Sequence, residues 1–82
     1  MARLPEPCVT YDPVIDTMWV DFRRGEQTAR TRALDPSRIV DLNAAGQPIV
    51  IELVGVSRSV NFAGLPEEEA VRRAVREARL PA

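Results

Sequence analysis

The 82-residue sequence has 45% hydrophobic and 28% charged residues and a formal net charge of -1, which excludes a disordered or fibrous chain. A chain of this length holds one small core and is only marginally stable alone, so we expect a single domain that forms a homodimer. No apolar run approaches the roughly 20 residues of a transmembrane helix, so we expect no membrane insertion.

The first third of the chain predicts a loose leader followed by a β-hairpin. Residues 1–7 carry two prolines and little that packs. Residues 8–11 form a strand that ends at Asp12-Pro13, because proline holds its predecessor in an extended or turn conformation. Residues 17–22 are rich in β-branched and aromatic side chains and predict the second strand. The β body is expected to extend from residue 8 to about residue 56.

Residues 28–34 predict a third strand of different character. Arg30 and Arg32 alternate with Thr31 and Ala33, so the strand is mostly polar. Such a strand suits either the edge of a sheet, where charged side chains are common, or a solvent-facing position.

Residues 39–42 and 48–54 predict a second hairpin, with Gly46 in its turn. If Asn43 pairs with Gln47, the register can be counted along both strands. It places Val40 opposite Val50, Ile39 opposite Ile51, and Arg38 opposite Glu52 as a cross-strand ion pair. Both faces of this hairpin are then apolar, with Ile39, Ile49, Ile51 and Leu53 on one and Val40, Leu42, Val50 and Val54 on the other.

Residues 66–79 predict the C-terminal helix. Pro66 suits the first turn of this helix. Acidic residues lie near its start and basic residues near its end, as the helix dipole favours, and small apolar residues recur at helical spacing. The predicted fold class is therefore α+β: an antiparallel four- to five-stranded β-meander with one C-terminal α-helix. Because one short helix cannot cover two apolar faces, we expect a second copy or another protein to cover the other.

The candidate interface residues follow from these patterns. Trp19 points away from Met18 and Val20, and we interpret it either as core or as an interface anchor. The candidate interface set is Trp19, Ile39, Ile49, Ile51 and Leu53. The candidate partner-binding residues are Arg30, Arg32, Arg72 and Arg76.

Catalytic residues are scarce in this sequence. Histidine is absent, no serine lies in a nucleophile motif, and no glycine-rich phosphate loop occurs. Cys8 is the single cysteine and no signal peptide precedes it, so we expect a reduced thiol in the cytoplasm. We therefore predict no enzyme, no catalytic or metal-ligating residues and no cofactor.

Two alternatives remain open at this point. The carboxylates Asp12, Asp16, Asp41 and Glu52 are hard oxygen ligands, which a metal-dependent enzyme or metal-binding protein uses for Mg²⁺ or Ca²⁺. The competing interpretation is that Asp12 and Asp16 stabilise turns. The arginine face of the predicted helix is the other alternative, as a nucleic-acid site, although glutamates on the same helix make nucleic-acid binding the weaker prediction.

The order of these elements resembles the small prokaryotic family called domain of unknown function 2283. The resemblance is carried by residues 11–20, which contain Tyr11, Asp12 and Asp16, by residues 39–46 with Asp41 and Gly46, and by residues 49–53 with Glu52, followed by Val56-Ser57. The resemblance implies a β-meander. It implies no catalytic role for these residues, because the family has no established biochemical activity. Because members are commonly encoded beside small ribonuclease-like toxins, it also implies an antitoxin-like partner role. Our leading hypothesis is a non-enzymatic interaction module with a protein partner encoded nearby.

Overall fold

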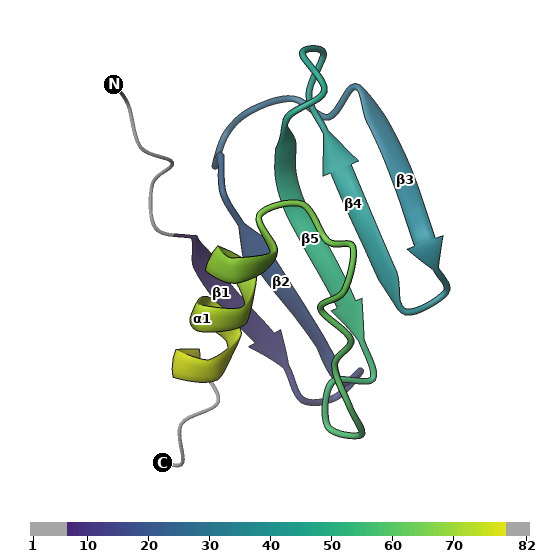
Figure 1. Cartoon of the computed structure of the whole chain (residues 1–82), viewed down its shortest axis with the longest axis vertical. Coiled ribbons are helices and arrows are strands. Elements are labelled where there is room, and N and C mark those ends of the chain that lie inside the picture. Colours follow the sequence, from purple (N-terminus) through teal and green to yellow (C-terminus); the bar gives the residue numbers. More distant parts are fainter. Residues whose placement is uncertain (1–6, 79–82) are drawn as a thin grey trace.

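Five strands and one helix make up the described part of the chain, residues 7–78 of a computed structural model (Figure 1). In chain order the elements are β1 (Cys8–Asp12), β2 (Thr17–Asp21), β3 (Arg30–Asp35), β4 (Arg38–Leu42), β5 (Pro48–Val54) and α1 (Glu68–Ala78). The predicted α+β class, with an antiparallel sheet and a C-terminal helix, is confirmed. The predicted leader, apart from Pro7, and position 79 of the predicted helix lie outside the described residues.

The strand order is β1-β2-β5-β4-β3, with all neighbours antiparallel. The predicted hairpins β1–β2 and β4–β5 are confirmed, and β3 is an edge strand as predicted. The meander is not strictly sequential, because β2 pairs with β5 and the connection from β2 to β3 passes the end of the sheet (Figure 1). β5, whose alternate residues are buried, lies in the centre, whereas the polar β3 lies at the edge.

The β4–β5 turn forms as predicted. Asn43 donates its backbone N–H to the carbonyl of Gln47 at 2.9 Å, and its side-chain oxygen accepts from the N–H groups of Ala45 and Gln47. Gly46 has a φ of 81°, which is a conformation that glycine adopts without strain.

The register beyond this turn is one residue away from the predicted one. A bulge lies where Asp41 pairs with Val50 and Leu42 with Pro48, which leaves Ile49 without a partner on β4. The observed pairs are therefore Val40 with Ile51, Ile39 with Glu52, and Arg38 with Leu53. The predicted pairs and the predicted ion pair between Arg38 and Glu52 are wrong, because a slip of one residue sends every later side chain to the opposite face.

The core lies on the side of the sheet that faces α1. α1 contacts β1 and β2, and the segment from residue 55 to 67 runs beside it (Figure 1). The buried cluster contains Met18, Val20, Phe22, Val40, Ile51, Leu53, Val56, Leu65, Val71 and Val75. The predicted apolar stripe of the helix is confirmed by Val71 and Val75, which are at most 1% exposed.

Three candidate interface residues belong to this side. Ile49, Ile51 and Leu53 are 5%, 0% and 2% exposed within the chain itself. All three are therefore covered by other residues of the same chain, which leaves them little surface for a partner.

The helix begins at Glu68, two positions after the predicted start. Glu67 has a left-handed φ of 55°, so the helical backbone cannot extend back through it to Pro66. Glu68 and Glu69 lie in the first turn and Arg76 in the last, as the helix dipole favours. The helix of the described chain lacks the length and apolarity to cross a membrane.

Candidate functional site

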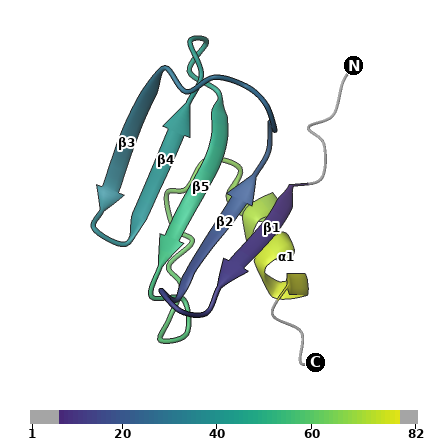
Figure 2. The same ribbon diagram turned by 180° about the vertical axis from the view of Figure 1, so that it is seen from behind.

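The face of the sheet opposite α1 is not covered by any element of the described chain (Figure 2). We call it the open face and define it by two rows of paired residues. The first row is Thr10, Trp19, Glu52, Ile39 and Ala33, and the second is Cys8, Asp21, Val50, Asp41 and Thr31. Paired residues share a face, so each row crosses all five strands.

The centre of the open face combines apolar and acidic side chains. Trp19 and Ile39 pair with Glu52 from either side, and Val50 lies between Asp21 and Asp41 in the next row. All six residues are half-buried. The open face thus offers an indole and two β-branched side chains that exclude water, with three carboxylates among them.

These carboxylates have few partners within the described chain. Asp41 accepts a hydrogen bond from the hydroxyl of Thr31 at 2.8 Å. Asp21 Oδ1 is buried and accepts no hydrogen bond from residues 7–78. The two rows contain no arginine. Arg24 places its Nη1 3.8 Å from the sulfur of Cys8, and Arg23 donates to the backbone carbonyl of Pro48. The open face is therefore acidic.

The structure brings together only two of the five candidate interface residues. Trp19 and Ile39 flank Glu52 on the open face, whereas the other three lie in the core. Sequence reasoning did not assign Asp21, Val50 and Glu52 to this surface. Along β5, buried and half-buried residues alternate, so Val50 and Glu52 share one face. Which residues of β4 lie on that face depends on the bulge, which the sequence analysis did not predict.

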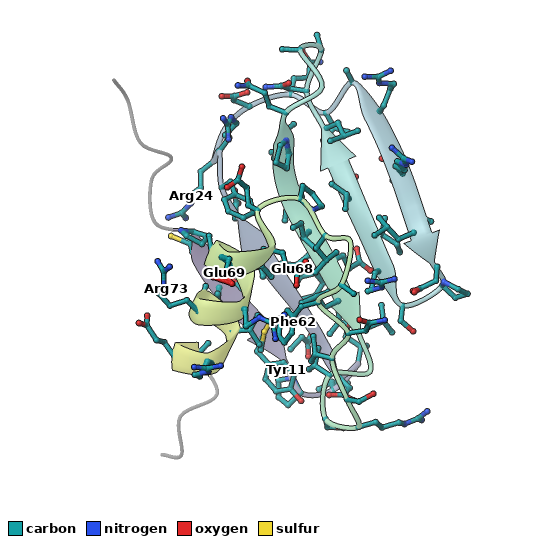
Figure 3. All side chains as sticks on the ribbon, in the orientation of Figure 1. Tyr11, Arg24, Phe62, Glu68, Glu69 and Arg73 are labelled. Atoms are coloured by element: carbon teal, nitrogen blue, oxygen red, sulfur yellow. The ribbon has the colours of Figure 1, made fainter. Side chains whose placement is uncertain are left out.

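The four candidate arginines do not form one cluster. Arg30 and Arg32 are exposed on β3, at the edge of the sheet farthest from the strands that α1 contacts. Arg72 donates to Glu68 at 2.8 Å and lies 5.0 Å from the ring centre of Phe62, whereas Arg76 is exposed. Figure 3 shows Glu68 and Phe62 on the side of α1 that faces the preceding loop, with Arg73 projecting from the other side.

The four candidate carboxylates of a metal site also lie apart. Asp12 accepts a hydrogen bond from the backbone N–H of Val14, which is the predicted turn interaction. Asp41 and Glu52 lie on the open face, and Asp16 lies in the turn between β1 and β2. Within residues 7–78 no group of three or more acidic or thiol side chains is arranged to hold a metal ion.

Asp16 is the centre of a hydrogen-bonded cluster. Its carboxylate accepts from the hydroxyl of Tyr11 at 2.8 Å and from the hydroxyl of Ser57 at 2.6 Å. Its backbone carbonyl accepts from the N–H groups of Gly55 and Val56. The cluster joins the β1–β2 turn to the end of β5, and it explains the left-handed φ of 53° at Asp16. The hydrogen bonds from Ser57 and Tyr11 lower the pKa of Asp16 below its ordinary value.

This lowered pKa predicts a pH-dependent contribution to stability. The contribution is present above the ordinary aspartate pKa near 3.8 and is lost as the pH falls through the lower pKa of the folded state. We expect Asp16→Asn to melt a few degrees below the wild type at pH 7 and the difference to shrink by pH 3. Thermal melts of both proteins between pH 7 and pH 3 measure it. A difference that stays constant with pH would contradict this account, and Glu69→Gln on the exposed helix surface is the control.

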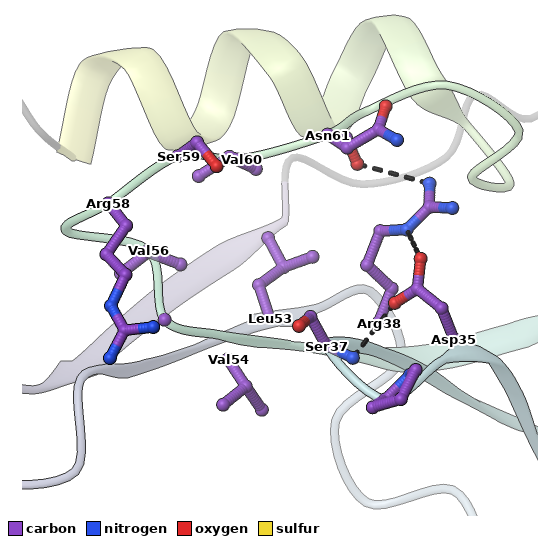
Figure 4. Close-up of a pocket in the computed structure, with 12 residues that line it drawn as sticks. Asp35, Ser37, Arg38, Leu53, Val54, Val56, Arg58, Ser59, Val60 and Asn61 are labelled. Carbon is purple, nitrogen blue, oxygen red and sulfur yellow. Dashed lines mark hydrogen bonds and ion pairs between the residues drawn. The ribbon is translucent and has the colours of Figure 1, made fainter.

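A cavity of about 360 Å³ lies where the loop after β5 passes the ends of β4 and β5 (Figure 4). Arg38 closes one side of it. Its Nε donates to Asp35 at 2.8 Å, and its Nη1 donates to the carbonyls of Asn61 and Ala63. The hydrogen bond from Arg38 also lowers the pKa of Asp35. Arg38 thus holds the loop on the sheet, and Arg58 is the other cation that lines this cavity.

A family model described as a protein of unknown function (DUF2283) matches residues 9–57, which include strands β2 to β5 and all of β1 except Cys8. The chain belongs to the DUF2283 family. The comparisons with curated proteins and with solved structures gave no match. α1 lies outside the part of the chain that matches the DUF2283 model.

The positions that carry the DUF2283 resemblance have distinct places in the fold. Tyr11 and Asp16 belong to the turn cluster, and Gly46 forms the β4–β5 turn. Asp41 and Glu52 lie on the open face. The family pattern thus includes residues that stabilise the turns of the sheet and two of the three carboxylates on the open face.

Proposed function

We propose that this DUF2283 protein is a prokaryotic, cytoplasmic, non-enzymatic interaction module whose open face binds a basic protein surface. The observation that supports it is the row in which Trp19 and Ile39 flank Glu52, on a sheet face that the described chain leaves uncovered. A partner surface that carries arginine or lysine among apolar side chains would complement this row.

The chemistry of the open face favours a cationic partner. The carboxylates of Glu52, Asp21 and Asp41 attract cations, and the indole of Trp19 adds a ring face on which a guanidinium can stack. The apolar residues between them exclude water when they are covered, which strengthens each charge pair. Buried aromatic side chains near the centre of an interface commonly dominate its binding energy.

An antitoxin-like role fits this surface. A ribonuclease presents cationic side chains to the phosphates of its substrate. An acidic face that covers those side chains would compete with RNA directly. A small ribonuclease-like toxin encoded beside this gene, as the family resemblance implies, is therefore the proposed partner. The same charges repel nucleic acid from the open face.

The homodimer remains a separate prediction. Face-to-face packing of two open faces would bring Asp21, Asp41 and Glu52 of each copy close to the same carboxylates of the other. Like charges in an interface cost free energy, so we expect a dimer, where one forms, to use another surface. Light scattering at micromolar concentration measures the oligomeric state.

Binding to the toxin tests the proposal. We expect the double variant Trp19→Ala/Glu52→Arg to bind an inactive form of the adjacent ribonuclease-like protein at least tenfold more weakly, because it removes an aromatic anchor and reverses a central charge. Calorimetry measures the affinity, and suppression of toxin-induced growth arrest measures the function. Glu69→Arg makes the same charge reversal on α1 and is the matched control.

The outcomes separate the hypotheses. Equal binding by the double variant and by the control would overturn the open face as the binding surface. Binding that is lost only in the double variant would support it, provided that circular dichroism shows an unchanged fold. Mg²⁺ or Ca²⁺ that raises the melting temperature would instead favour the metal-dependent alternative.

A further inference from the structure

The outer edge of β3 is unpaired within the described chain. β3 pairs with β4 on one side, and no strand of residues 7–78 lies on its other side. The backbone of an edge strand presents N–H and C=O groups that an incoming strand can bond. β3 has six residues, Arg30–Asp35, and four of them are exposed.

A groove runs beside this edge on the side of the sheet that faces α1. It has a volume of about 320 Å³ and is lined by Arg32, Leu34, Val40, Leu42, Gly46, Gly64 and Pro66. The helix contacts β1 and β2 and does not extend over this part of the sheet. Leu34 and Leu42 are therefore half-buried rather than covered.

Two arginines border the groove. Arg30 pairs with Leu42 and Arg32 pairs with Val40, so both guanidinium groups lie on the same side of the sheet as the groove. Both side chains are exposed, and neither makes an ion pair or a hydrogen bond with another side chain of residues 7–78. The nearest acidic residue of β3, Asp35, is already bound to Arg38.

We propose that an extended acidic segment of a partner protein adds to the β3 edge as a sixth strand. Its alternate residues are carboxylates that pair with Arg30 and Arg32, and a leucine-sized side chain enters the groove beside Leu34. Backbone hydrogen bonds supply affinity in this mode of recognition, and alternate side chains supply specificity. This site lies at the edge of the sheet and on the face opposite the open face. Binding at the β3 edge can therefore be tested independently of binding at the open face.

Charge complementarity selects this occupant over a second copy of the chain. In the register centred on Thr31, an antiparallel pair of two β3 strands places Arg30 of one copy opposite Arg32 of the other. Like charges directly opposite each other destabilise a strand pair. An acidic segment removes this repulsion and satisfies both cations.

The probe is a synthetic, fluorescein-labelled eight-residue peptide, Val-Glu-Val-Glu-Val-Glu-Val-Leu, in which the three glutamates and the leucine fall on the same face of an extended strand. Fluorescence anisotropy measures its affinity for the full chain. We expect Arg30→Glu/Arg32→Glu to weaken binding at least tenfold, because both cross-strand charge pairs become repulsive. Arg73→Glu/Arg76→Glu makes the same change of charge on α1 and should weaken binding less than threefold. Amide shifts in the NMR spectrum should be confined to residues 30–35 and to the groove.

Two further peptides separate strand addition from simple charge attraction. N-methylation of alternate amides removes the backbone donors and should abolish binding, and a scrambled peptide of equal charge should bind at least tenfold more weakly. Equal affinity of the scrambled peptide, or equal loss in both arginine variants, would overturn the proposal. Tighter binding of an oligonucleotide of the same length with the same dependence on Arg30 and Arg32 would assign the edge to nucleic acid instead.

Discussion

We expect Ile51→Ala to lower the free energy of unfolding by about 3 to 4 kcal/mol, in the range measured for such truncations in well-packed cores. Ile51 is 0% exposed on the central strand, between Val20 of β2 and Val40 of β4. Its removal leaves a cavity beneath the segment that covers β5. A loss of this size is a large share of the stability of so short a chain.

The neighbouring residue Val50 is the matched control. It lies on the same strand but on the open face, where it is half-buried, so Val50→Ala should cost about 1 kcal/mol or less. Urea denaturation followed by circular dichroism measures both variants. Similar losses at the two positions would contradict the observed faces of β5. A variant Ile51→Ala that loses only self-association, with unchanged monomer stability, would contradict the burial of Ile51 within a single chain.

We expect Arg38→Met to lower the free energy of unfolding by about 2 to 3 kcal/mol. Methionine keeps much of the apolar stem but removes the two charge-assisted hydrogen bonds that reach the carbonyls of Asn61 and Ala63. These bonds connect β4 to the loop that leads to α1. The loss should therefore appear in the loop and the helix as well as in the global stability.

Hydrogen exchange locates this effect. In Arg38→Met, amide protection should fall first in the loop and in α1, while the β1–β2 hairpin keeps more of its protection. Arg38→Lys keeps the charge but not the forked geometry, and we expect it to recover only part of the stability. Arg32 is an exposed arginine on the neighbouring strand β3, and Arg32→Met should change the free energy of unfolding by about 0.5 kcal/mol or less. Unchanged stability in Arg38→Met would contradict the role of Arg38 in holding the loop.

The net charge of -1 conceals an uneven distribution of charge. The open face displays Asp21, Asp41 and Glu52, whereas the exposed arginines of β3 lie on the other side of the sheet. A chain of this kind can contact a basic partner with one side and an acidic segment with the other. Both proposed sites use the β strands, which the family model covers, rather than the helix, which it does not.

Local patterns were sufficient for much of the fold. The Asn43 to Gln47 turn, the edge position of β3 and the amphipathic helix each depend on residues close together in the sequence. The Asx interaction of Asp12 is local in the same sense. The contact between Asp16 and Ser57 spans 41 positions, and no local rule predicts it.

The α+β class, the two hairpins, the helix and the separation of Trp19 from the Met18 side of its strand all follow from patterns that can be read in the sequence alone. Local patterns do not show which β4 residues share a face with Ile51, because the bulge at Ile49 shifts the register by one residue and strand side chains alternate with a period of two. The buried face of β5 is set by distant residues of the core cluster, among them Val56, Leu65 and Val71. The tertiary structure also decided that β2 pairs with β5, which places Glu52 between Trp19 and Ile39. The open face is made of residues from all five strands, so its acidic character results from long-range pairing that short-range patterns do not contain.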